Sequence, residues 1–269
     1  MTAADLAMLT EAAADHRLPY GPDPQQFGDL YLPGRPGPHP VIVMLHGGCW
    51  QAGYGLGHMG QLCAALRNEG FAVWNLEYRR LGNGGGWPVT FRDVSAGSDF
   101  LKEIAGRFLL DLSRPIAVGH SAGGHLALWL AGRHRLPAAS PLFSNGLPMR
   151  GVLVLAGIPD LAEGAKRGIC GGACRDLAGG SPEEVPDRYR QASPMALLPF
   201  GVPQRHLIGL EDEVIPVDYI RKYVAAAGKL DDVRVDLVPD AGHYELIVPR
   251  PPAWTFVRNA ALAIFNRSI

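Results

Sequence analysis

The stretch AVGHSAGGHLALWLAG, residues 117–132, places a serine at the joint of two apolar segments. The residues that lead to Gly119 form a short apolar run with β-branched side chains, and those after Ser121 are apolar nearly all round. The first run is typical of a strand buried on both faces of a parallel sheet, and the second of a helix packed deep against that sheet. The stretch therefore predicts a strand that turns sharply into a buried helix at Ser121.

Segments of the same two kinds alternate along the chain. Stripes with helical spacing lie between the apolar runs; in one of them Met59, Leu62, Cys63 and Leu66 occupy positions i, i+3, i+4 and i+7. Such alternation predicts an α/β fold with a mostly parallel central sheet and helices on both faces. The further runs that we expect to form strands are residues 41–45, 71–76, 151–157, 205–209 and 233–239.

The chain has 269 residues, 47% of them hydrophobic, and can bury one large core. No repeat or low-complexity linker divides it, so we expect a single domain over residues 1–269. One region breaks the alternation, because residues 158–200 are rich in Gly, Pro and charge and have no clean period. Long irregular excursions in such domains are usually functional. We interpret this one as a small lid-like insertion that covers the site and sets the substrate range.

Charge and hydropathy restrict the partners of the protein. A net charge of −1 offers no basic surface for nucleic acid or for anionic membranes. No apolar run reaches the roughly 18 residues that suggest a membrane-spanning helix. The N-terminal stretch is acidic and lacks the continuous apolar core of a secretory signal. We expect a cytoplasmic protein that acts on a small molecule, with a homodimer left open.

The four cysteines are Cys49, Cys63, Cys170 and Cys174. Cys63 falls on a helical stripe and is expected to be a small buried apolar residue. The spacing of Cys170 and Cys174 leaves a local disulfide or half of a metal site open, although one pair with this spacing is a weak metal signal. We expect reduced thiols and neither a metal nor an organic cofactor.

The residues from Gly119 to Gly123 have the form G-x-S-x-G. Ligands bind beyond the carboxyl ends of the strands in a parallel sheet, which is where Ser121 falls. Glycines at the flanking positions allow the tight, strained turn that lifts the serine oxygen clear of the sheet. The following helix directs its positive end at any anion formed there. The pattern predicts a nucleophilic Ser121 rather than a helix-capping serine.

A serine hydroxyl needs a base, and the base needs an acid that orients it. His243 follows the last predicted strand in a Gly-flanked loop, and Asp212 follows the strand before it. Both lie at strand ends, so they can converge with Ser121. Glu211 and Glu213 compete for the role of the acid; Asp212 is preferred because a short carboxylate suits a tight loop.

The segment MLHGGCW, residues 44–50, follows the first strongly apolar strand. Glycines there let the main chain approach a substrate and turn its amides toward a negatively charged oxygen. We expect the N–H groups of Gly48, Cys49 and Ala122 to form this oxyanion hole. His46 is interpreted as a buttress of the loop.

Three aromatic residues near strand ends, Trp50, Tyr54 and Trp87, are candidates for the wall of a substrate pocket, and they fit the core equally well. Glu77 and Arg79 are interpreted as a buried ion pair rather than as substrate contacts.

The HGG-x-W loop, the GHSAGG turn and the late Asp and His together resemble the α/β-hydrolase superfamily. Within it they are similar to the esterase/lipase branch, which includes hormone-sensitive-lipase-like carboxylesterases and kynurenine formamidases. The resemblance covers about residues 27–265. Cys49 in place of a third glycine, followed by Trp50, and the segment LEYR at 76–79 are closer to the formamidase-like group.

This resemblance implies a serine esterase that cleaves small carboxylic esters through an acyl-enzyme intermediate and needs no cofactor. The alternative within the same chemistry is an aryl-formamidase acting on N-formyl amides. A binding module that has lost catalysis is the alternative outside enzymology; such proteins usually lack one of the three catalytic side chains, and all three candidates are present here.

Overall fold

The computed structural model describes residues 1–9 and 11–266 and contains one sheet of eight strands. The strands are β1 (His16–Pro19), β2 (Phe27–Tyr31), β3 (His39–Leu45), β4 (Ala72–Leu76), β5 (Leu110–His120), β6 (Val152–Leu155), β7 (Gln204–Gly209) and β8 (Val233–Val238). Their order is β1-β2-β4-β3-β5-β6-β7-β8. The pairs from β4 to β8 are parallel, whereas β1 and β2 are antiparallel to their neighbours.

The predicted mostly parallel sheet is therefore confirmed, and the runs expected as strands correspond to β3 through β8. Strands β1 and β2 were not predicted from the sequence. Strand β1 alternates half-buried and exposed residues because it lies at the edge of the sheet. Two short strands of mixed polarity carry little of the continuous apolar signal that marks the central strands.

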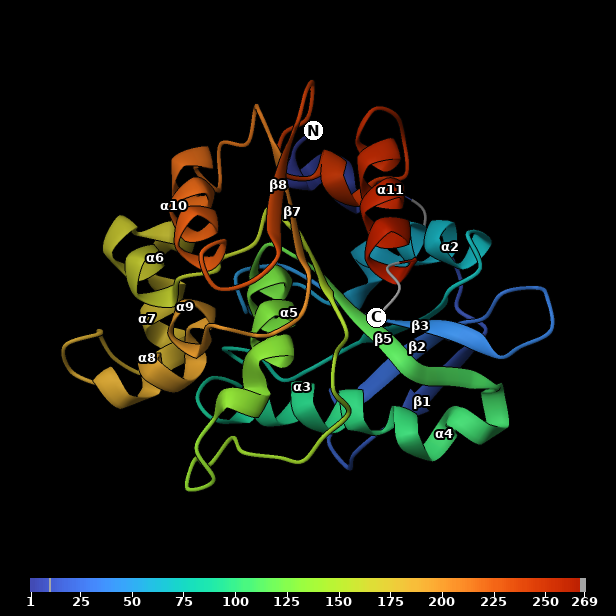
Figure 1. Cartoon of the computed structure of the whole chain (residues 1–269), viewed down its shortest axis with the longest axis horizontal. Helices are drawn as coiled ribbons and strands as arrows, with labels where there is room; N and C mark the ends of the chain where they lie inside the picture. The colour runs from blue at the N-terminus through green and yellow to red at the C-terminus, as the bar shows by residue number, and fades with distance from the viewer. Residues whose placement is uncertain (10, 267–269) are drawn as a thin grey trace.

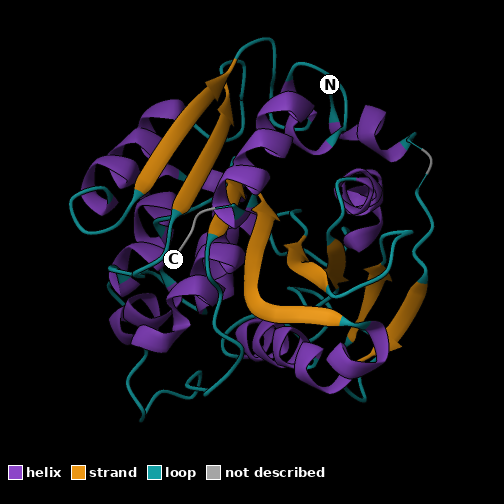
Figure 2. Cartoon of the chain, turned by 45° about the vertical axis from the view of Figure 1, so that its right-hand side comes forward, coloured by secondary structure: helices purple, strands orange, loops and turns teal. Residues whose placement is uncertain are grey.

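Helices lie on both sides of the sheet (Figure 2). In Figure 1, α2 (Gly60–Asn68) and α11 (Ala253–Phe265) lie above the central strands, and α3 (Val89–Asp99) and α4 (Leu101–Phe108) lie below them. Helix α5 (Ala122–Gly132) is buried along its whole length. The remaining helices outside residues 158–200 are α1 (Ala3–Ala7), η1 (Leu56–Met59), η2 (Arg133–Arg135), α10 (Val217–Ala227) and η4 (Glu245–Ile247).

Strand register brings distant loops together. Leu45 of β3 pairs with Gly119 of β5, so the loop after β3 leaves the sheet beside the turn that carries Ser121. Gly209 of β7 pairs with Val238 of β8, so the loops after these two strands also leave side by side.

Residues 158–200 are helical, not irregular as the sequence suggested. They form α6 (Leu161–Arg167), η3 (Ile169–Gly172), α7 (Ala173–Ala178), α8 (Pro186–Ala192) and α9 (Pro194–Leu197), which gather beside α10 in Figure 1. None of these helices exceeds seven residues. Helices of about two turns or fewer are too short to display a repeating apolar stripe, which is why the pattern was missed.

Over the described part of the chain, no helix combines the length and apolar character needed to cross a bilayer.

Candidate active site

Ser121 lies in the turn between β5 and α5 with φ 53° and ψ −121°. A left-handed φ is rare for a residue with a side chain and is maintained by its surroundings. The neighbouring glycines explain how the turn fits: a Cβ on Gly119 would lie 2.1 Å from the oxygen of Gly123, and one on Gly123 would lie 2.0 Å from the oxygen of Leu45. The structure thus gives Ser121 the strained turn that the G-x-S-x-G pattern predicts.

Asp212 and His243 are in contact, with His243 Nδ1 donating to Asp212 Oδ2 over 2.8 Å. The other carboxylate oxygen, Oδ1, accepts from the N–H groups of Val214 and Ile215, each at 2.8 Å. The Asp212 side chain is fully buried and that of His243 is 5% exposed. These bonds fix the carboxylate and leave the Nε2 side of the imidazole for another partner.

His120 anchors the loop that carries His243: its Nε2 donates to the backbone oxygen of His243 over 3.0 Å. The two rings lie 4.5 Å apart. Burial, together with the nearby His243, lowers the pKa of His120 well below its usual value, so its ring stays neutral. His120 occupies the variable position before the serine, and the sequence pattern assigned it no role.

The turn after β3 has consecutive left-handed residues, Gly48 (φ 106°), Cys49 (φ 50°) and Trp50 (φ 54°). Within the described residues, the N–H groups of Gly48 and Cys49 form no hydrogen bond. Ala122 begins α5, where the first N–H groups of a helix have no intrahelical acceptor. Gly47 approaches Ser121 so closely that a Cβ on it would be 3.0 Å from the Cβ of the serine. The three predicted donors therefore lie on two turns packed against each other.

His46 supports this turn from behind. Its Nε2 contacts Glu77 Oε1 at 2.8 Å, its ring stacks on Tyr78, and its backbone oxygen accepts from the Tyr78 hydroxyl at 2.7 Å. Glu77 also pairs with Arg80 at 2.6 Å. Burial opposes ionisation of Glu77, but His46 and Arg80 outweigh it and lower its pKa to about 2.

The predicted ion pair between Glu77 and Arg79 is wrong, because each of the two residues has another partner. Arg79 binds Asp93 at 2.6 Å, whereas Glu77 forms its buried ion pair with Arg80. The expectation that Glu77 is structural agrees with this cluster.

A cavity of about 430 Å³ opens at these strand ends. Ser121 and His243 both line it, as do Gly48 and Cys49, so the predicted nucleophile, base and oxyanion turn share one space. The other lining residues described are Leu6, Glu11, Gly53, Tyr54, Gly55, Gly57, His58, His120, Val214 and Tyr244.

Of the three aromatic candidates for the pocket wall, Tyr54 lines this cavity. Trp50 is fully buried, its ring packs edge-to-face with that of His125 at 5.2 Å between ring centroids, and it belongs to the core. The Trp87 ring packs on Phe91, and the backbone N–H of Trp87 donates to the backbone oxygen of Leu177 at 2.8 Å. Neither Trp50 nor Trp87 is among the residues that line this cavity. For Trp50, the left-handed turn at Cys49 and Trp50 directs the indole inward.

Sequence reasoning missed several lining residues. His58 follows the HGG loop on η1, and burial together with His46 lowers its pKa to about 3. Leu6 and Glu11 come from the N-terminal segment, which carried no signal of a functional role. Tyr244 could have been predicted to line the cavity, because it directly follows His243 in the loop of the predicted base.

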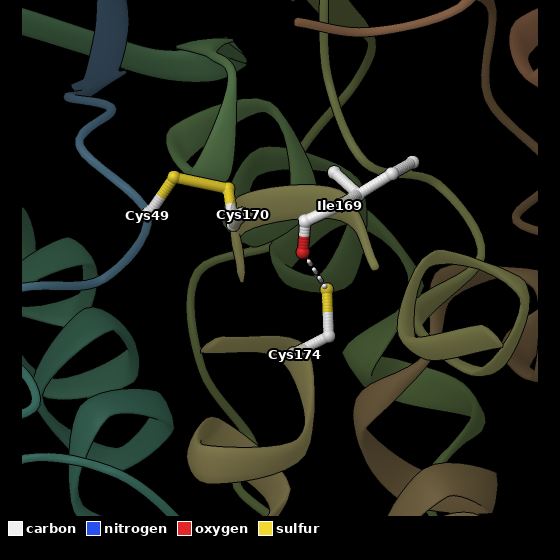
Figure 3. The surroundings of a disulfide bond; sticks show 4 residues. All are labelled: Cys49, Ile169, Cys170 and Cys174. Atoms are coloured by element: carbon white, nitrogen blue, oxygen red, sulfur yellow. Dashed lines mark hydrogen bonds between the residues drawn. A yellow bond between two sulfur atoms is a disulfide. The ribbon is translucent and has the colours of Figure 1, made fainter. Parts of the chain in front are cut away.

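The cysteine expectation is also corrected. Cys49 and Cys170 form a disulfide across a separation of 121 residues, with their Cα atoms 5.6 Å apart (Figure 3). Cys63 and Cys174 are free and buried. The expectation of four reduced thiols is therefore wrong, and so is the alternative of a local Cys170–Cys174 disulfide. Because Cys170 is oxidised, it has no thiolate with which to bind a metal. In the described residues, no group of three His, Cys, Asp or Glu side chains is arranged to hold a metal ion.

This sheet, with a serine at the turn into a buried helix, defines a protein of the α/β-hydrolase fold. Solved structures share it. Esterase B from Lactobacillus rhamnosis superposes with a TM-score of 0.81 at 21% identity, covering 97% of this chain and 89% of that chain. A truncated carbohydrate esterase from gut microbiota superposes with a TM-score of 0.78 at 20% identity, covering 96% and 98%. At such identities the likeness concerns the fold.

Residues 29–222 match the BD-FAE family, and the chain belongs to it. Esterase LipC of Mycobacterium tuberculosis is 27% identical over 243 residues, which are 84% of this chain and 59% of LipC. A probable isoprenylcysteine alpha-carbonyl methylesterase of Arabidopsis thaliana is 33% identical over 110 residues, 40% of this chain and 22% of that protein. The chain thus spans less than two thirds of either relative. The predicted superfamily is confirmed.

Proposed function

We propose that the protein is a serine esterase that cleaves small carboxylic esters through an acyl-enzyme intermediate. The observation that carries the proposal is the placement of Ser121 in a strained turn on the same cavity as His243, whose Nδ1 is bonded to a buried Asp212. The names of its relatives support ester chemistry, since LipC is an esterase and the Arabidopsis protein a probable methylesterase. None of the proteins named above is a formamidase, so the comparisons give that alternative no support.

In the proposed reaction, Ser121 Oγ attacks the carbonyl carbon of the ester while His243 Nε2 takes the hydroxyl proton. The bond between the carbonyl carbon and the alcohol oxygen then breaks, and His243 returns the proton to the leaving alcohol. Water repeats these steps and releases the acid and free Ser121. Asp212 keeps the proton of His243 on Nδ1, so Nε2 is free to accept.

The negative oxygen of each tetrahedral intermediate would be held by the N–H groups of Gly48, Cys49 and Ala122. The first two are without a hydrogen bond in the described structure, and the third is at a helix N-terminus, where the dipole favours negative charge. One donor of this kind is worth about 3 to 4 kcal/mol of transition-state stabilisation.

The size of the cavity favours small substrates. About 430 Å³ is at the lower end of the range for small-molecule sites and suits a short acyl group better than a lipid chain. The role of residues 158–200 as a lid stays a prediction. None of the lining residues described for this cavity belongs to this segment; the segment is joined to the lining through the disulfide between Cys170 and Cys49.

The single-domain boundaries, the homodimer and the cytoplasmic location also stay predictions. A disulfide is more typical of an oxidising compartment than of the cytoplasm, so the thiol state of the protein in its cell tests that location.

The experiment is a series of p-nitrophenyl acetate, butyrate, octanoate and palmitate, measured beside N-formylkynurenine. We expect kcat/KM to be highest for acetate or butyrate and to fall toward palmitate. Ser121→Ala is the control that separates enzyme turnover from background hydrolysis. Faster turnover of N-formylkynurenine than of every ester, or preference for palmitate, would contradict the proposal.

A further inference from the structure

The disulfide joins two parts of the molecule that the proposed mechanism treats separately. Cys49 is at the crest of the turn after β3 and lines the cavity, and Cys170 is on η3 in the segment 158–200 (Figure 3). The bond therefore reaches from a predicted oxyanion donor to an element outside the sheet.

The turn is well anchored at its flanks and weakly at its crest. On one flank the backbone oxygen of His46 accepts from Tyr78, and on the other the oxygen of Trp50 accepts from the N–H of Leu81 at 2.8 Å. At the crest, Gly48 accepts a bond from Gln51 within the same turn. Among the described interactions, the disulfide is the only bond that ties the crest to another segment.

The crest also needs such a tie. Cys49 and Trp50 both have φ near the left-handed value, at 50° and 54°. Residues with side chains adopt this conformation at a cost of about 1 kcal/mol or more each, and they keep it when the surroundings enforce it. The burial of Trp50 enforces its conformation, whereas Cys49 is half-buried and held through its sulfur.

The other end of the tie is firm. Cys174 Sγ donates to the backbone oxygen of Ile169, beside Cys170, at 3.5 Å. The preceding α6 is fixed to α10 through Tyr219, whose hydroxyl donates to the oxygen of Asp160 at 2.7 Å. The following α7 accepts a bond from the N–H of Trp87 through the oxygen of Leu177 at 2.8 Å. Cys170 therefore moves with a packed group of helices and can hold the crest in place.

We propose that the Cys49–Cys170 disulfide sets the position of the oxyanion turn, which makes Cys170 a positioning residue for the esterase reaction and makes the rate sensitive to dithiol reductants. The inference rests on the proposed function. Both cysteines are half-buried rather than sealed in the core, so a small dithiol can reach the bond. One dithiol passes two electrons and two protons to the pair, giving two cysteine thiols and the oxidised cyclic disulfide of the reagent.

Loosening the crest should lower kcat more than it raises KM, because the donors act on the charge that develops in the transition state. Losing one oxyanion donor costs about 10² to 10³ in kcat, and a donor that is displaced for part of the time costs less. We expect kcat to fall by about 10- to 100-fold with KM changed by less than about threefold. Phosphonylation of Ser121 by a fluorophosphonate should slow by a similar factor.

The test compares wild type, Cys170→Ser and Cys174→Ser. Cys170→Ser breaks the tie without altering a donor residue. Cys174→Ser is the matched control: it lies four residues away, is bonded to no other cysteine, and its hydroxyl keeps a donor for the backbone oxygen of Ile169. Each protein is treated with dithiothreitol, desalted under argon and assayed with p-nitrophenyl acetate well below its thermal midpoint. Thiols are counted in denaturant, and oxidised dithiothreitol is then added back.

We expect wild type to show two thiols before reduction and four after, with kcat lost on reduction and restored on oxidation. Cys170→Ser should have the low kcat throughout, and Cys174→Ser should respond as wild type does. A reduced wild type with four thiols and unchanged kcat would overturn the proposal, as would four thiols in the untreated protein. Cys170→Ser and reduced wild type reach the unbonded state by different routes, so one remains decisive if the other fails to fold. Absence of both ester turnover and phosphonylation in the oxidised protein would refute the proposed function instead.

Discussion

Replacing Asp212 by asparagine should disable the base while leaving the fold intact. Asp212 Oδ1 accepts from two backbone N–H groups, those of Val214 and Ile215, each at 2.8 Å. An asparagine must keep its carbonyl oxygen there, because its NH₂ group cannot accept hydrogen bonds. The NH₂ group then takes the place of Asp212 Oδ2 and faces His243 Nδ1, which lies 2.8 Å from Oδ2 in the wild type. Two donors cannot share one bond, so Nδ1 must become an acceptor.

With Nδ1 deprotonated, the proton of neutral His243 moves to Nε2, the nitrogen that must accept the proton of Ser121. The base is then held in the wrong tautomer, which in serine hydrolases costs about 10⁴ in kcat. That factor corresponds to about 5 kcal/mol of activation free energy. KM should change little, because substrate contacts and the oxyanion donors are untouched.

The assay is steady-state turnover of p-nitrophenyl acetate by Asp212→Asn, with the thermal midpoint as the check on folding. Glu211→Gln and Glu213→Gln are the matched controls, because these side chains lie beside Asp212 and are exposed. A tenth of the wild-type kcat in Asp212→Asn, or an equal loss of activity in a control variant, would show that Asp212 does not set the tautomer of His243.

Three further outcomes are expected. Ser121→Ala should fold normally and lose about 10⁴-fold or more in kcat; a tenth of the activity in pure protein would exclude Ser121 as the nucleophile. Turnover should survive EDTA and stop with a serine-directed organophosphonate, and loss to the chelator with recovery on adding zinc would contradict the metal-free mechanism. Burial lowers the pKa of His206 in β7 to about 3, so this histidine is protonated in the unfolded chain below pH 6.5 but neutral in the folded one. Its contribution to stability is complete above pH 6.5 and is lost as pH falls toward 3, by about 2 kcal/mol at pH 5. Urea unfolding of His206→Leu should therefore show a smaller loss of stability between pH 7.5 and 5 than wild type, and an equal loss would contradict this.

The central sheet and the polar residues at its edge could be predicted because both depend on local sequence. Residues 41–45 of β3 and the whole of β6 are continuous apolar runs, and β5 and β7 are buried along nearly all the residues that approach the site. Ser121, Asp212 and His243 follow the parallel strands β5, β7 and β8 by a few residues, so their neighbourhood follows from the parallel arrangement alone.

The partners of Cys49 and Trp50 could not be predicted in the same way. The pairing of cysteines does not follow from their spacing in the sequence. Cys170 is four residues from Cys174, yet it is bonded to Cys49, 121 residues away. The direction of the Trp50 side chain depends on left-handed backbone at both Cys49 and Trp50. In a sequence, glycine is the residue that indicates such a conformation, and neither of these positions is a glycine. Both features were decided by how the turn packs against distant segments.

The acidic cluster after β7 shows how local hydrogen bonding separates residues that the sequence could only rank. Asp212 bonds to N–H groups two and three residues further along the chain, as a short carboxylate in a turn does. That turn buries its side chain completely, while Glu211 and Glu213 remain exposed. A buried carboxylate is tolerated when its oxygens are bonded, and here the backbone satisfies one oxygen and His243 the other. A glutamate at 212 carries one more methylene and would overreach the two N–H groups. The turn thus selects aspartate on structural grounds, and the same bonds leave its second oxygen directed at His243.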